Sequence, residues 1–403
     1  MSLPKIFHIL IGDKSATLDE VKVLPDKVIF HARIKKKKKR CACCGSSKVQ
    51  QKDSKKRTLR ACNLSNQKTY IEIITYKLLC LSCGKRAWMK LPFAMGKYPL
   101  TKSFVTYIIS LIGISTLLHV ARLFNLQWKT VKNLDKENLK RRPKQFSFKK
   151  LEYLSIDEIA IRKGHHYMTI ISDIATGQII YAVEGRKEEV LVPFLKKLKH
   201  RARKLKAIAM DMSAGYAGAV KKYLSHIAIV FDRFHVTKVL TGAVDEVRKE
   251  EWKRCLEQGH NVAKGKRFLL LRNFDNLDAS GKAGLEELLR INEKLAIAHS
   301  MKEQFRLFWD QPNREEGCKF LSSWIVGAIS SEVKPLQKAA RTLLNHWEGL
   351  LNYFDHKIDN GKAEGINNKI KTMKRQAYGF RDFEYFILKL YNLHKTTHAL
   401  VGC

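Results

Sequence analysis

The feature that most constrains the fold is a series of short apolar runs between residues 151 and 231. Each run has the length of a β-strand, and turn-forming pairs such as Thr176-Gly177 separate the first ones. The predicted strands cover residues 151–157, 167–173, 178–184, 206–211 and 226–231, and the predicted helices between them cover residues 188–204 and 214–224. This β-β-β-α-β-α-β order is typical of an RNase H-like α/β domain.

A long helical stretch interrupts this domain. From residue 233 to residue 354 the apolar spacing is almost entirely helical, and such a length is too great for a loop in a compact domain. Two last helices are predicted over residues 364–376 and 382–394. We therefore expect a multidomain α+β chain in which the RNase H-like domain covers residues 151–232 and 355–397, with a helical insertion domain over residues 233–354.

Two cysteine knuckles of the form C-x-x-C-G precede the apolar series, 35 residues apart. They supply the thiols of Cys41, Cys44, Cys80 and Cys83, and four converging thiolates make a tetrahedral, structural Zn²⁺ site. Cys43 is an alternative to Cys44, but the two-residue gap and the turn-forming Gly45 favour Cys44. Free buried thiols are disfavoured because lysine and arginine flank both knuckles. We expect an N-terminal zinc-binding domain over residues 1–98, whose alternating residues 1–34 predict short strands.

Residues 117–134 fit a helix-turn-helix. Ala121 is small where two helices cross, and Asn125 can adopt the left-handed turn conformation. The second helix would enter the major groove. The candidate DNA contacts on it are Gln127, Trp128, Lys129, Lys132 and Asn133. We place this DNA-binding domain over residues 99–142, followed by a basic linker over residues 140–150; an unrelated helical hairpin is the alternative.

The charge of the chain predicts a polyanionic partner. The 76 Lys and Arg residues exceed the 38 Asp and Glu residues by 38, and residues 1–150 alone carry a net charge of +26. One uncharged stretch, residues 103–121, approaches the length that spans a bilayer, but its seven polar side chains favour a buried helix pair. No signal peptide is visible at the start. We therefore expect a cytoplasmic, nucleoid-associated DNA-binding protein that does not enter a membrane.

Three acids stand where an RNase H-like sheet would bring them together. Asp157 lies on the first strand, Asp211 ends the fourth, and Glu364 opens a later helix. Cleavage of a phosphodiester bond with magnesium needs carboxylates that hold two ions about 4 Å apart. Oxygen ligands suit hard ions such as Mg²⁺ or Mn²⁺. The sequence predicts that Asp157, Asp211 and Glu364 form a catalytic site with two such ions, although a single strand-end acid is often only a helix cap.

Other residues compete for roles at this site or surround it. Asp232 also follows an apolar strand and is a rival to Asp211, or it caps the next helix beside a supporting His235. Glu158 should point to the opposite face of the strand from Asp157. The helix that begins near Glu364 carries amides and cations along one wall, which predicts further DNA contacts from Asn368, Lys371, Lys374 and Arg375.

Taken together, these motifs resemble those of the transposases of the ISL-three family of bacterial insertion sequences. The resemblance covers nearly the whole length, from the paired knuckles through Ser155-Ile156-Asp157-Glu158, Asp211-Met212-Ser213 and Asp232-Arg233-Phe234-His235 to the segment that runs from Glu364 to Phe380. It implies a DDE catalytic domain whose acids fall on Asp157, Asp211 and Glu364, with a helical insertion before the glutamate. It also implies that the N-terminal domains bind the terminal inverted repeats of the element.

We therefore expect a DNA transposase that hydrolyses the ends of its element and then joins the freed 3′-hydroxyl to target DNA. Because two ends must meet, we expect at least a homodimer on DNA, assembled in part through the helical insertion. Two rivals belong to other classes: a DNA-binding regulator that does no chemistry, and a nuclease without joining activity. A strand-transfer assay separates all three.

Overall fold

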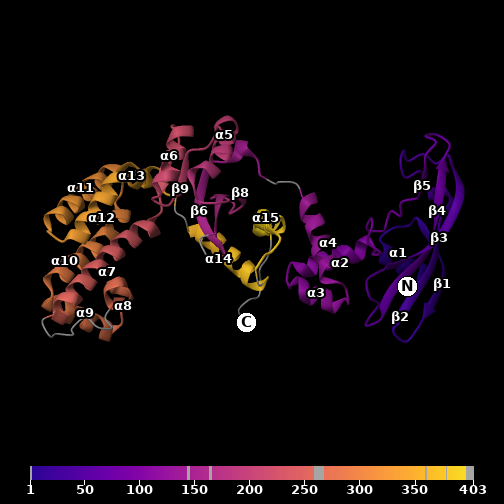
Figure 1. Ribbon diagram of the computed structural model, residues 1–403, viewed down its shortest axis with the longest axis horizontal. Helices are drawn as coiled ribbons and strands as arrows, with labels where there is room; N and C mark the ends of the chain where they lie inside the picture. The colour runs from indigo at the N-terminus through magenta and orange to yellow at the C-terminus, as the bar shows by residue number, and fades with distance from the viewer. Residues whose placement is uncertain are drawn as a thin grey trace. The chain divides into compact units, whose positions relative to one another are not determined.

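The chain folds into two compact units, Met1–Arg142 and Pro143–Lys395, in the computed structural model (Figure 1). The structure describes residues 2–142, 146–162, 166–257, 267–358, 361–377 and 379–395. The residues of the two predicted N-terminal domains lie in the first unit, and residues 151–395, which belong to the other two predicted domains, lie in the second. The predicted linker includes residues 143–145, which lie outside the described residues; α4 precedes them and the short η2 (Phe148–Lys150) follows.

The first unit contains a five-stranded sheet. Its strands are β1 (Ala16–Val23), β2 (Lys27–Ile34), β3 (Val49–Arg60), β4 (Lys68–Cys80) and β5 (Arg86–Trp88), in the order β1-β2-β4-β3, with β5 also paired to β4. Alternate residues of β2 and β4, such as Phe30, Ile71 and Ile73, are buried and form its core. The two cysteine knuckles lie at one end of the long antiparallel β3–β4 pair, where Val49 is opposite Cys80.

The first predicted strand segment is wrong, because the chain begins with a helix, α1 (Leu3–Ile11). Pro4 is in the first turn, where a missing backbone N–H costs nothing, and Gly12 ends the helix in the left-handed conformation with a φ of 64°. Phe7, Leu10 and Ile11 are buried on one side of this helix. Strands β1 and β2 then follow as the alternating pattern predicts.

Three helices complete the first unit: α2 (Lys102–Ile112), α3 (Leu117–Leu123) and α4 (Trp128–Arg141). Thr116 caps α3 by accepting a hydrogen bond from the His119 backbone N–H at 3.2 Å. Between α3 and α4, Asn125 has a φ of 50°, so it adopts the predicted left-handed conformation. Val120, Val131 and Leu134 are fully buried where these helices meet.

The second unit contains the other five-stranded sheet, in the order β10-β9-β6-β7-β8. Its strands are β6 (Tyr153–Arg162), β7 (His166–Asp173), β8 (Ile179–Glu184), β9 (Ala207–Met210) and β10 (Ala228–Phe231). Strands β6, β7 and β8 are antiparallel neighbours, whereas β9 is parallel to β6 and β10 is parallel to β9. The predicted β-β-β-α-β-α-β order is confirmed.

Helices cover both faces of this sheet. The helices α5 (Val192–Arg201) and α6 (Ala214–Tyr223) pack on the face that carries Leu154, Ile156 and Met210. The helices α14 (Gly361–Gln376) and α15 (Phe383–Tyr391) pack on the face that carries Ile159, Met168 and Ile170 (Figure 1). Successive residues of a strand therefore face different helix pairs. This alternation decides which helix pair each carboxylate of the strands faces.

Between β10 and α14 the described chain is helical, as predicted. The helices are α7 (Arg233–Glu257), α8 (Arg267–Leu271), α9 (Ala279–Ile291), α10 (Glu293–Phe305), α11 (Arg314–Ser330), α12 (Lys334–Asn345) and α13 (Trp347–His356), with the short turn η5 (Arg306–Asp310). Helix α13 returns to the sheet and packs on β10. There the Asn352 amide donates to the Ile229 carbonyl at 2.8 Å.

Close packing of α13 on β10 leads to a stability prediction for Gly349→Ala. A Cβ at Gly349 would lie 2.2 Å from the Phe231 ring, so the ring and its strand must move. We expect a loss of about 2–3 kcal/mol in the free energy of unfolding, measured by urea denaturation. Gly242→Ala is the matched control, because its Cβ would meet no atom within 4 Å; it should stabilise the chain slightly. Equal effects of the two changes would contradict this account.

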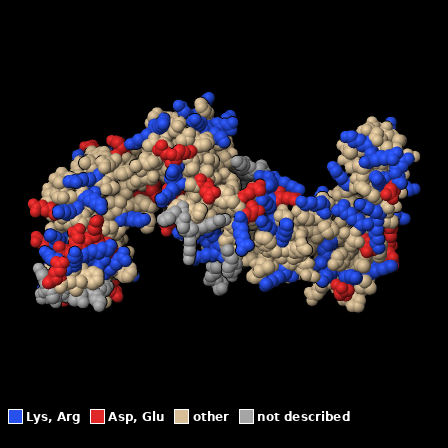
Figure 2. Space-filling model, in the orientation of Figure 1, with Lys and Arg blue, Asp and Glu red and all other residues tan. Residues whose placement is uncertain are grey.

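Two surface properties bear on partners. None of the described helices combines the length and the apolar character needed to cross a membrane. Lys and Arg side chains are spread over the visible face of the first unit (Figure 2). In the exposed strand β3, the basic residues include Lys52, Lys55, Lys56 and Arg57. This strand therefore presents a cationic surface suited to phosphate groups.

Candidate functional site

Three carboxylates form a row in the second unit, at the point where the parallel pairing of β6, β9 and β10 ends. Ile156 of β6 pairs with Met210 of β9, and Met210 pairs with Phe231 of β10. The next residue along each of these segments is Asp157, Asp211 or Asp232. Because neighbouring strands lie about 4.8 Å apart, this register places the three acids side by side. They face away from α5 and α6, since the preceding apolar residues of β6 and β9 pack against those helices.

His235, in the first turn of α7, lies between two of these acids. Its Nδ1 is 2.8 Å from Asp211 Oδ1 and 2.8 Å from Asp232 Oδ2. The Nδ1–H is shared between these two carboxylates, and Asp211 Oδ1 is buried with no other hydrogen-bond donor among the described residues. Hydrogen bonds to Asp211 and Asp232 raise the pKa of His235 to about 9. The imidazole is therefore positively charged at neutral pH in the metal-free site.

Asp157 is held from both sides. Its Oδ1 accepts a hydrogen bond from the Glu158 backbone N–H at 2.7 Å, and its Oδ2 accepts one from the Asn367 amide of α14 at 2.6 Å. Burial and the nearby Asp211 carboxylate raise the pKa of Asp157 to about 6. A buried carboxylate whose pKa is raised by a neighbouring carboxylate in this way favours a bound cation. Glu158 points to the other face of β6, where burial and the Glu158 carboxylate raise the pKa of Tyr216.

The set of side chains fits a divalent cation. Ligand atoms of Asp211, Asp232 and His235 all lie within 4.8 Å of one another. Asp211 Oδ1 is buried and shares its one neighbouring donor, the His235 Nδ1–H, with Asp232, so a metal would satisfy its remaining capacity as an acceptor. Even with His235 protonated, the four groups Asp157, Asp211, Asp232 and His235 carry excess negative charge when the acids are ionised. Carboxylate oxygens are the ligands that Mg²⁺ and Mn²⁺ prefer.

Glu364 is one helical turn away from this cluster. It lies in the first turn of α14, three residues before Asn367, so the two side chains share a face of the helix. The Asn367 amide reaches Asp157, whereas the Glu364 side chain is exposed. Among the described residues, the group of possible metal ligands formed by Asp211, Asp232 and His235 does not include Glu364. The structure thus brings Asp157 and Asp211 together and brings the helix of Glu364 beside them.

The predicted DNA contacts on α14 separate into two kinds. Asn368, Lys371 and Arg375 are exposed, as a DNA-facing wall requires. The ammonium of Lys374 instead donates to the Ala160 carbonyl of β6 at 2.5 Å, and burial lowers its pKa. Together with the buried Ile366, Ile370 and Met373, this bond fixes α14 on the sheet.

The four predicted zinc ligands converge in the first unit. Sγ of Cys41 is 3.8 Å from Sγ of Cys83, and Sγ of Cys44 is 3.5 Å from Sγ of Cys80. Tetrahedral coordination at Zn–S distances of about 2.3 Å places sulfur atoms about 3.8 Å apart. All four sulfur atoms lie within 4.8 Å of one another, and Cys43 is exposed and outside this group. The geometry therefore suits Zn²⁺.

The electrostatics of this cluster also call for a cation. Backbone N–H groups of Cys44 and Cys43 lower the pKa of Cys41 to about 6. At Cys83 a hydrogen bond from Lys85 opposes the shift, but burial and the neighbouring sulfur atoms raise the pKa to about 12. Four thiolates cannot coexist here without a positive charge, and a bound Zn²⁺ would supply it.

The predicted recognition helix is α4. Gln127, Trp128 and Lys129 are exposed at its start, and Lys132 and Asn133 are half-buried. The Lys132 ammonium lies 5.6 Å from the centre of the Trp128 ring. The start of α4 therefore presents a polar, cationic and aromatic surface.

The contact between Asn367 and Asp157 was not predicted. The sequence places Asn367 among the amides on the wall of the helix that begins near Glu364, but nothing in that spacing identifies its partner. Contacts between a helix and a strand 210 residues earlier depend on packing that local patterns do not encode.

Known proteins define the class to which this site belongs. A family model described as Transposase, that of the ISL-three insertion sequences, matches residues 154–390. The transposase for insertion sequence element IS1001 of Bordetella parapertussis is 32% identical over 339 residues, covering 83% of each protein. The transposase for insertion sequence element IS1557 of Mycobacterium tuberculosis is 26% identical over 287 residues, covering 65% of this chain and 64% of that protein.

A solved Drosophila P element transposase strand transfer complex covers 73% of this chain and 92% of its own chain at 11% identity. Its TM-score of 0.39 is below the level that establishes a common fold. The sequence matches place the protein in the class of DNA-cutting and DNA-transferring enzymes. Within that class, the chain belongs to the ISL-three family of transposases.

Proposed function

We propose that the second unit is an RNase H-like catalytic domain that cuts the ends of an insertion sequence and joins them to target DNA. The observation that carries this proposal is the row of Asp157, Asp211 and Asp232 beside one another where the parallel pairing of β6, β9 and β10 ends, with His235 shared between two of them. The strand order and directions of the sheet support it. The boundaries proposed are residues 151–232 and 355–397, with the insertion over residues 233–354.

In this proposal Asp157, Asp211 and Glu364 hold two Mg²⁺ or Mn²⁺ ions, and Asp232 and His235 support them. Such ions activate the attacking water or 3′-hydroxyl and stabilise the leaving oxygen. Asn367 and the Glu158 N–H orient the Asp157 carboxylate. Asp211 and Asp232 share the His235 Nδ1–H, which fixes that ring beside both carboxylates. Glu364 reaches the ions by a change of its exposed side chain or of the first turn of α14.

The first unit would bind the terminal inverted repeats. In this proposal α3 and α4 form a helix-turn-helix whose contacts come from Gln127, Trp128, Lys129, Lys132 and Asn133. The zinc-closed sheet adds the cationic strand β3. The exposed Asn368, Lys371 and Arg375 of α14 would contact DNA at the catalytic site, and at least two chains would bring two ends together.

A strand-transfer assay tests the proposed function. The full chain is incubated with duplexes that carry the inverted repeats flanking its reading frame, a target plasmid, and Mg²⁺, Mn²⁺ or EDTA. We expect cut ends and joined products with either cation and neither with EDTA. Repeat binding without any cutting would identify a regulator, and cut ends that never join would identify a nuclease; either result overturns the proposal.

Asn367→Leu is expected to weaken the catalytic metal site. The change removes the donor that orients Asp157 and replaces it with an apolar group next to a carboxylate. Loss of an orienting partner typically lowers metal affinity by about 10- to 100-fold. Mn²⁺ binding followed by isothermal calorimetry measures the effect. Asn368→Leu alters an exposed amide on the same helix and should leave Mn²⁺ affinity unchanged; equal losses in both variants would contradict the role of Asn367.

A further inference from the structure

Lys and Arg residues are concentrated in one short part of the second unit. Residues 151–403 carry a net charge of +12, and residues 191–227 alone contain nine Lys and Arg residues and one acid, Asp211. Two thirds of the positive excess therefore lies in these 37 residues, which form α5, β9 and α6. Figure 2 shows Lys and Arg side chains gathered over α5 and α6. The proposed catalytic site does not use this charge.

Most of these cations have no partner of opposite charge. Among the described residues, eight of the nine are exposed and form no ion pair with a carboxylate. They lie between Lys196 and Lys204, on α5 and the turn after it, and at Lys221 and Lys222 of α6. The ninth, Lys206, pairs with Glu152 at 2.8 Å. We refer to the eight exposed cations as the α5–α6 patch. Because like charges repel one another in a compact fold, such a patch indicates an anionic partner.

Aromatic rings bring the cations of the two helices onto one surface. The ammonium groups of Lys196 in α5 and Lys222 in α6 lie 5.9 and 5.7 Å from the centre of the same Tyr223 ring. At the last residue of α5, the guanidinium carbon of Arg201 lies 5.8 Å from the centre of the Phe148 ring in η2. The two helices therefore present a single cationic surface.

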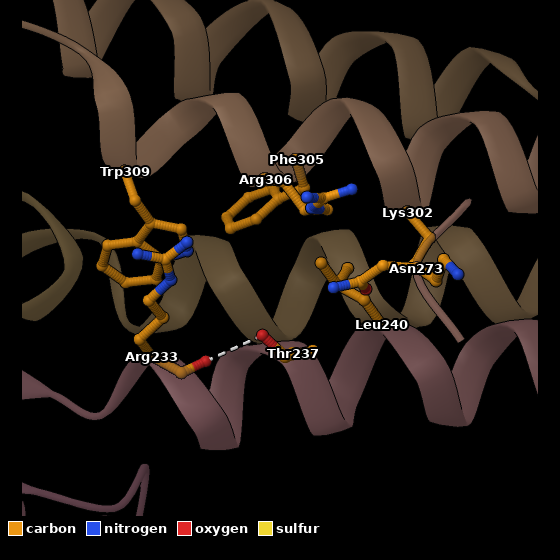
Figure 3. Close-up of a pocket in the computed structure, with 8 residues that line it drawn as sticks. All are labelled: Arg233, Thr237, Leu240, Asn273, Lys302, Phe305, Arg306 and Trp309. Atoms are coloured by element: carbon orange, nitrogen blue, oxygen red, sulfur yellow. Dashed lines mark hydrogen bonds between the residues drawn. The ribbon is translucent and has the colours of Figure 1, made fainter. Parts of the chain in front are cut away.

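The cations that line a pocket of the helical insertion differ, because the fold already uses their charge. This pocket lies between α7, α10 and η5, and its lining includes Arg233, Lys302 and Arg306 (Figure 3). Lys302 and Arg306 each pair with Glu303 at 2.8 Å. Arg233 lies over the Trp309 ring, with its guanidinium carbon 5.7 Å from the ring centre. The α5–α6 patch is thus the better candidate for a large anionic partner.

The surface of the patch does not suit a protein or a lipid bilayer. In the described part of the chain, none of the exposed large apolar side chains lies between residues 129 and 233. The apolar residues Phe194, Leu195 and Leu198 of α5 are buried in the core. Protein interfaces depend on a few large anchoring side chains, and a helix that lies on a bilayer needs an apolar face for the lipid. The patch offers neither.

The charge density of the patch matches that of a DNA duplex. Helix α5 has ten residues, so it is roughly 15 Å long. A duplex of that length carries about nine phosphate charges. Eight unpaired cations on and beside this helix can therefore contact phosphates in number, and contacts of this kind do not depend on the base sequence.

A duplex on the patch is not the duplex that lies on the acids. Helices α5 and α6 cover the face of the sheet that carries Ile156 and Met210, whereas Asp157 and Asp211 face away from both helices. The sheet and a helix layer about 10–12 Å thick separate the patch from the acids. Because DNA is stiff over about 150 base pairs, one straight duplex cannot lie on both faces.

We propose that the α5–α6 patch binds a second DNA duplex through its phosphates, without a preferred sequence. The proposal rests on the proposed function only in calling this duplex the second one, because binding to the patch needs neither the acids nor metal ions. It gives each chain a separate surface that holds DNA other than the element end on its own acids.

Two triple variants of the full chain test the proposal. The patch variant combines Lys196→Gln, Lys199→Gln and Lys222→Gln. The control variant removes three exposed cations of α7 and α12 that form no ion pair among the described residues, by Lys253→Gln, Lys334→Gln and Arg341→Gln. Glutamine has nearly the helix propensity of lysine and arginine, so both variants should fold. Each chain is loaded with one equivalent of unlabelled repeat duplex in EDTA. The anisotropy of a fluorescent duplex of unrelated sequence then gives its affinity at several salt concentrations.

The wild-type chain and the control variant should bind the unrelated duplex with the same salt dependence. In the patch variant, the slope of log affinity against log salt should fall by about 2–3, because each lost phosphate contact removes about 0.9. Equal slopes in all three chains overturn the proposal. A patch variant that loses affinity for phosphatidylserine vesicles but not for the duplex also overturns it, because the partner would then be a membrane.

A photocrosslinking amino acid in place of Lys199 identifies the DNA that touches the patch. We expect it to crosslink to the unrelated duplex, whereas the same group in place of Lys334 should not. Crosslinking to the repeat duplex alone overturns the proposal, because the patch would then contact the element end itself. A chain that binds the unrelated duplex through the patch but never cuts DNA overturns the proposed function and leaves this inference intact.

Discussion

Asp157→Asn and Asp211→Asn should each slow the cutting of element ends by roughly a thousandfold or more. Each change replaces a charged oxygen ligand with an amide, and both acids lie in the row that Ile156 and Met210 set by their pairing. Binding to the inverted repeats should stay within about twofold, since the proposed repeat contacts lie in the first unit. Single-turnover cleavage and electrophoretic mobility shifts measure the two quantities.

Glu158→Gln is the matched control for these variants. This acid is adjacent to Asp157 but points to the other face of β6, near Tyr216. Its loss should change cutting by no more than a few-fold. Wild-type rates in either aspartate variant would remove the basis of the proposed site. Glu364→Gln tests the third ligand. A loss of cutting as large as that in the aspartate variants supports Glu364 as this ligand. Such a loss in Asp232→Asn but not in Glu364→Gln would assign the position to Asp232.

The second large effect is expected in the zinc cluster. Cys41→Ser removes one of four sulfur atoms that lie within 4.8 Å of one another. Structural zinc contributes about 10–16 kcal/mol of binding free energy to small zinc domains, so the first unit should lose its fold around the knuckles. We expect repeat binding to weaken by about a hundredfold or more. Metal content by mass spectrometry should fall from one zinc per chain to none.

Cys43→Ser is the control for this prediction. Cys43 lies between the ligands in sequence, but its side chain is exposed and outside the cluster. This variant should keep one zinc per chain and bind repeats normally. Zinc retained in Cys41→Ser and lost in Cys43→Ser would mean that the first knuckle uses the other pair of thiols.

The strands and helices of the second unit could be predicted because local patterns match their environments. Residues of β9 and β10 are apolar throughout, as in parallel strands covered on both faces. The turn at Asn125 was predictable for a similar reason, because few residues tolerate a positive φ. In each case the chemistry of a few neighbouring residues determines the backbone.

Other elements could not be predicted because distant contacts decide them. In residues 3–11 the apolar spacing suits a strand or a helix, and burial of Phe7 and Ile11 selects the helix. The long strand β3 is polar and exposed along most of its length, so no apolar pattern marks it; its pairing with β4 defines it. The pocket is formed by Arg233 and Trp309, which are far apart in the chain.

The candidate site was also predictable only where local sequence determines it. Asp157 and Asp211 could be singled out because each follows an apolar segment predicted to be a strand, and the structure places the two acids beside each other. The sequence left Asp211 and Asp232 as rivals, whereas the structure gives both a contact with His235. The position of Glu364 depends on how α14 packs, through Ile370 and Lys374, on strands far earlier in the chain.

The pairing of β6, β9 and β10 has an evolutionary consequence. Copies of a mobile element accumulate mutations, and many apolar exchanges within Ala207–Met210 would leave the enzyme intact because they preserve the alternation of faces. Deleting one codon there would rotate Asp211 toward α5 and α6 while every acid remains in the gene. Genomic copies with such in-frame deletions should be immobile relics, even though a search for their acidic residues would score them as functional.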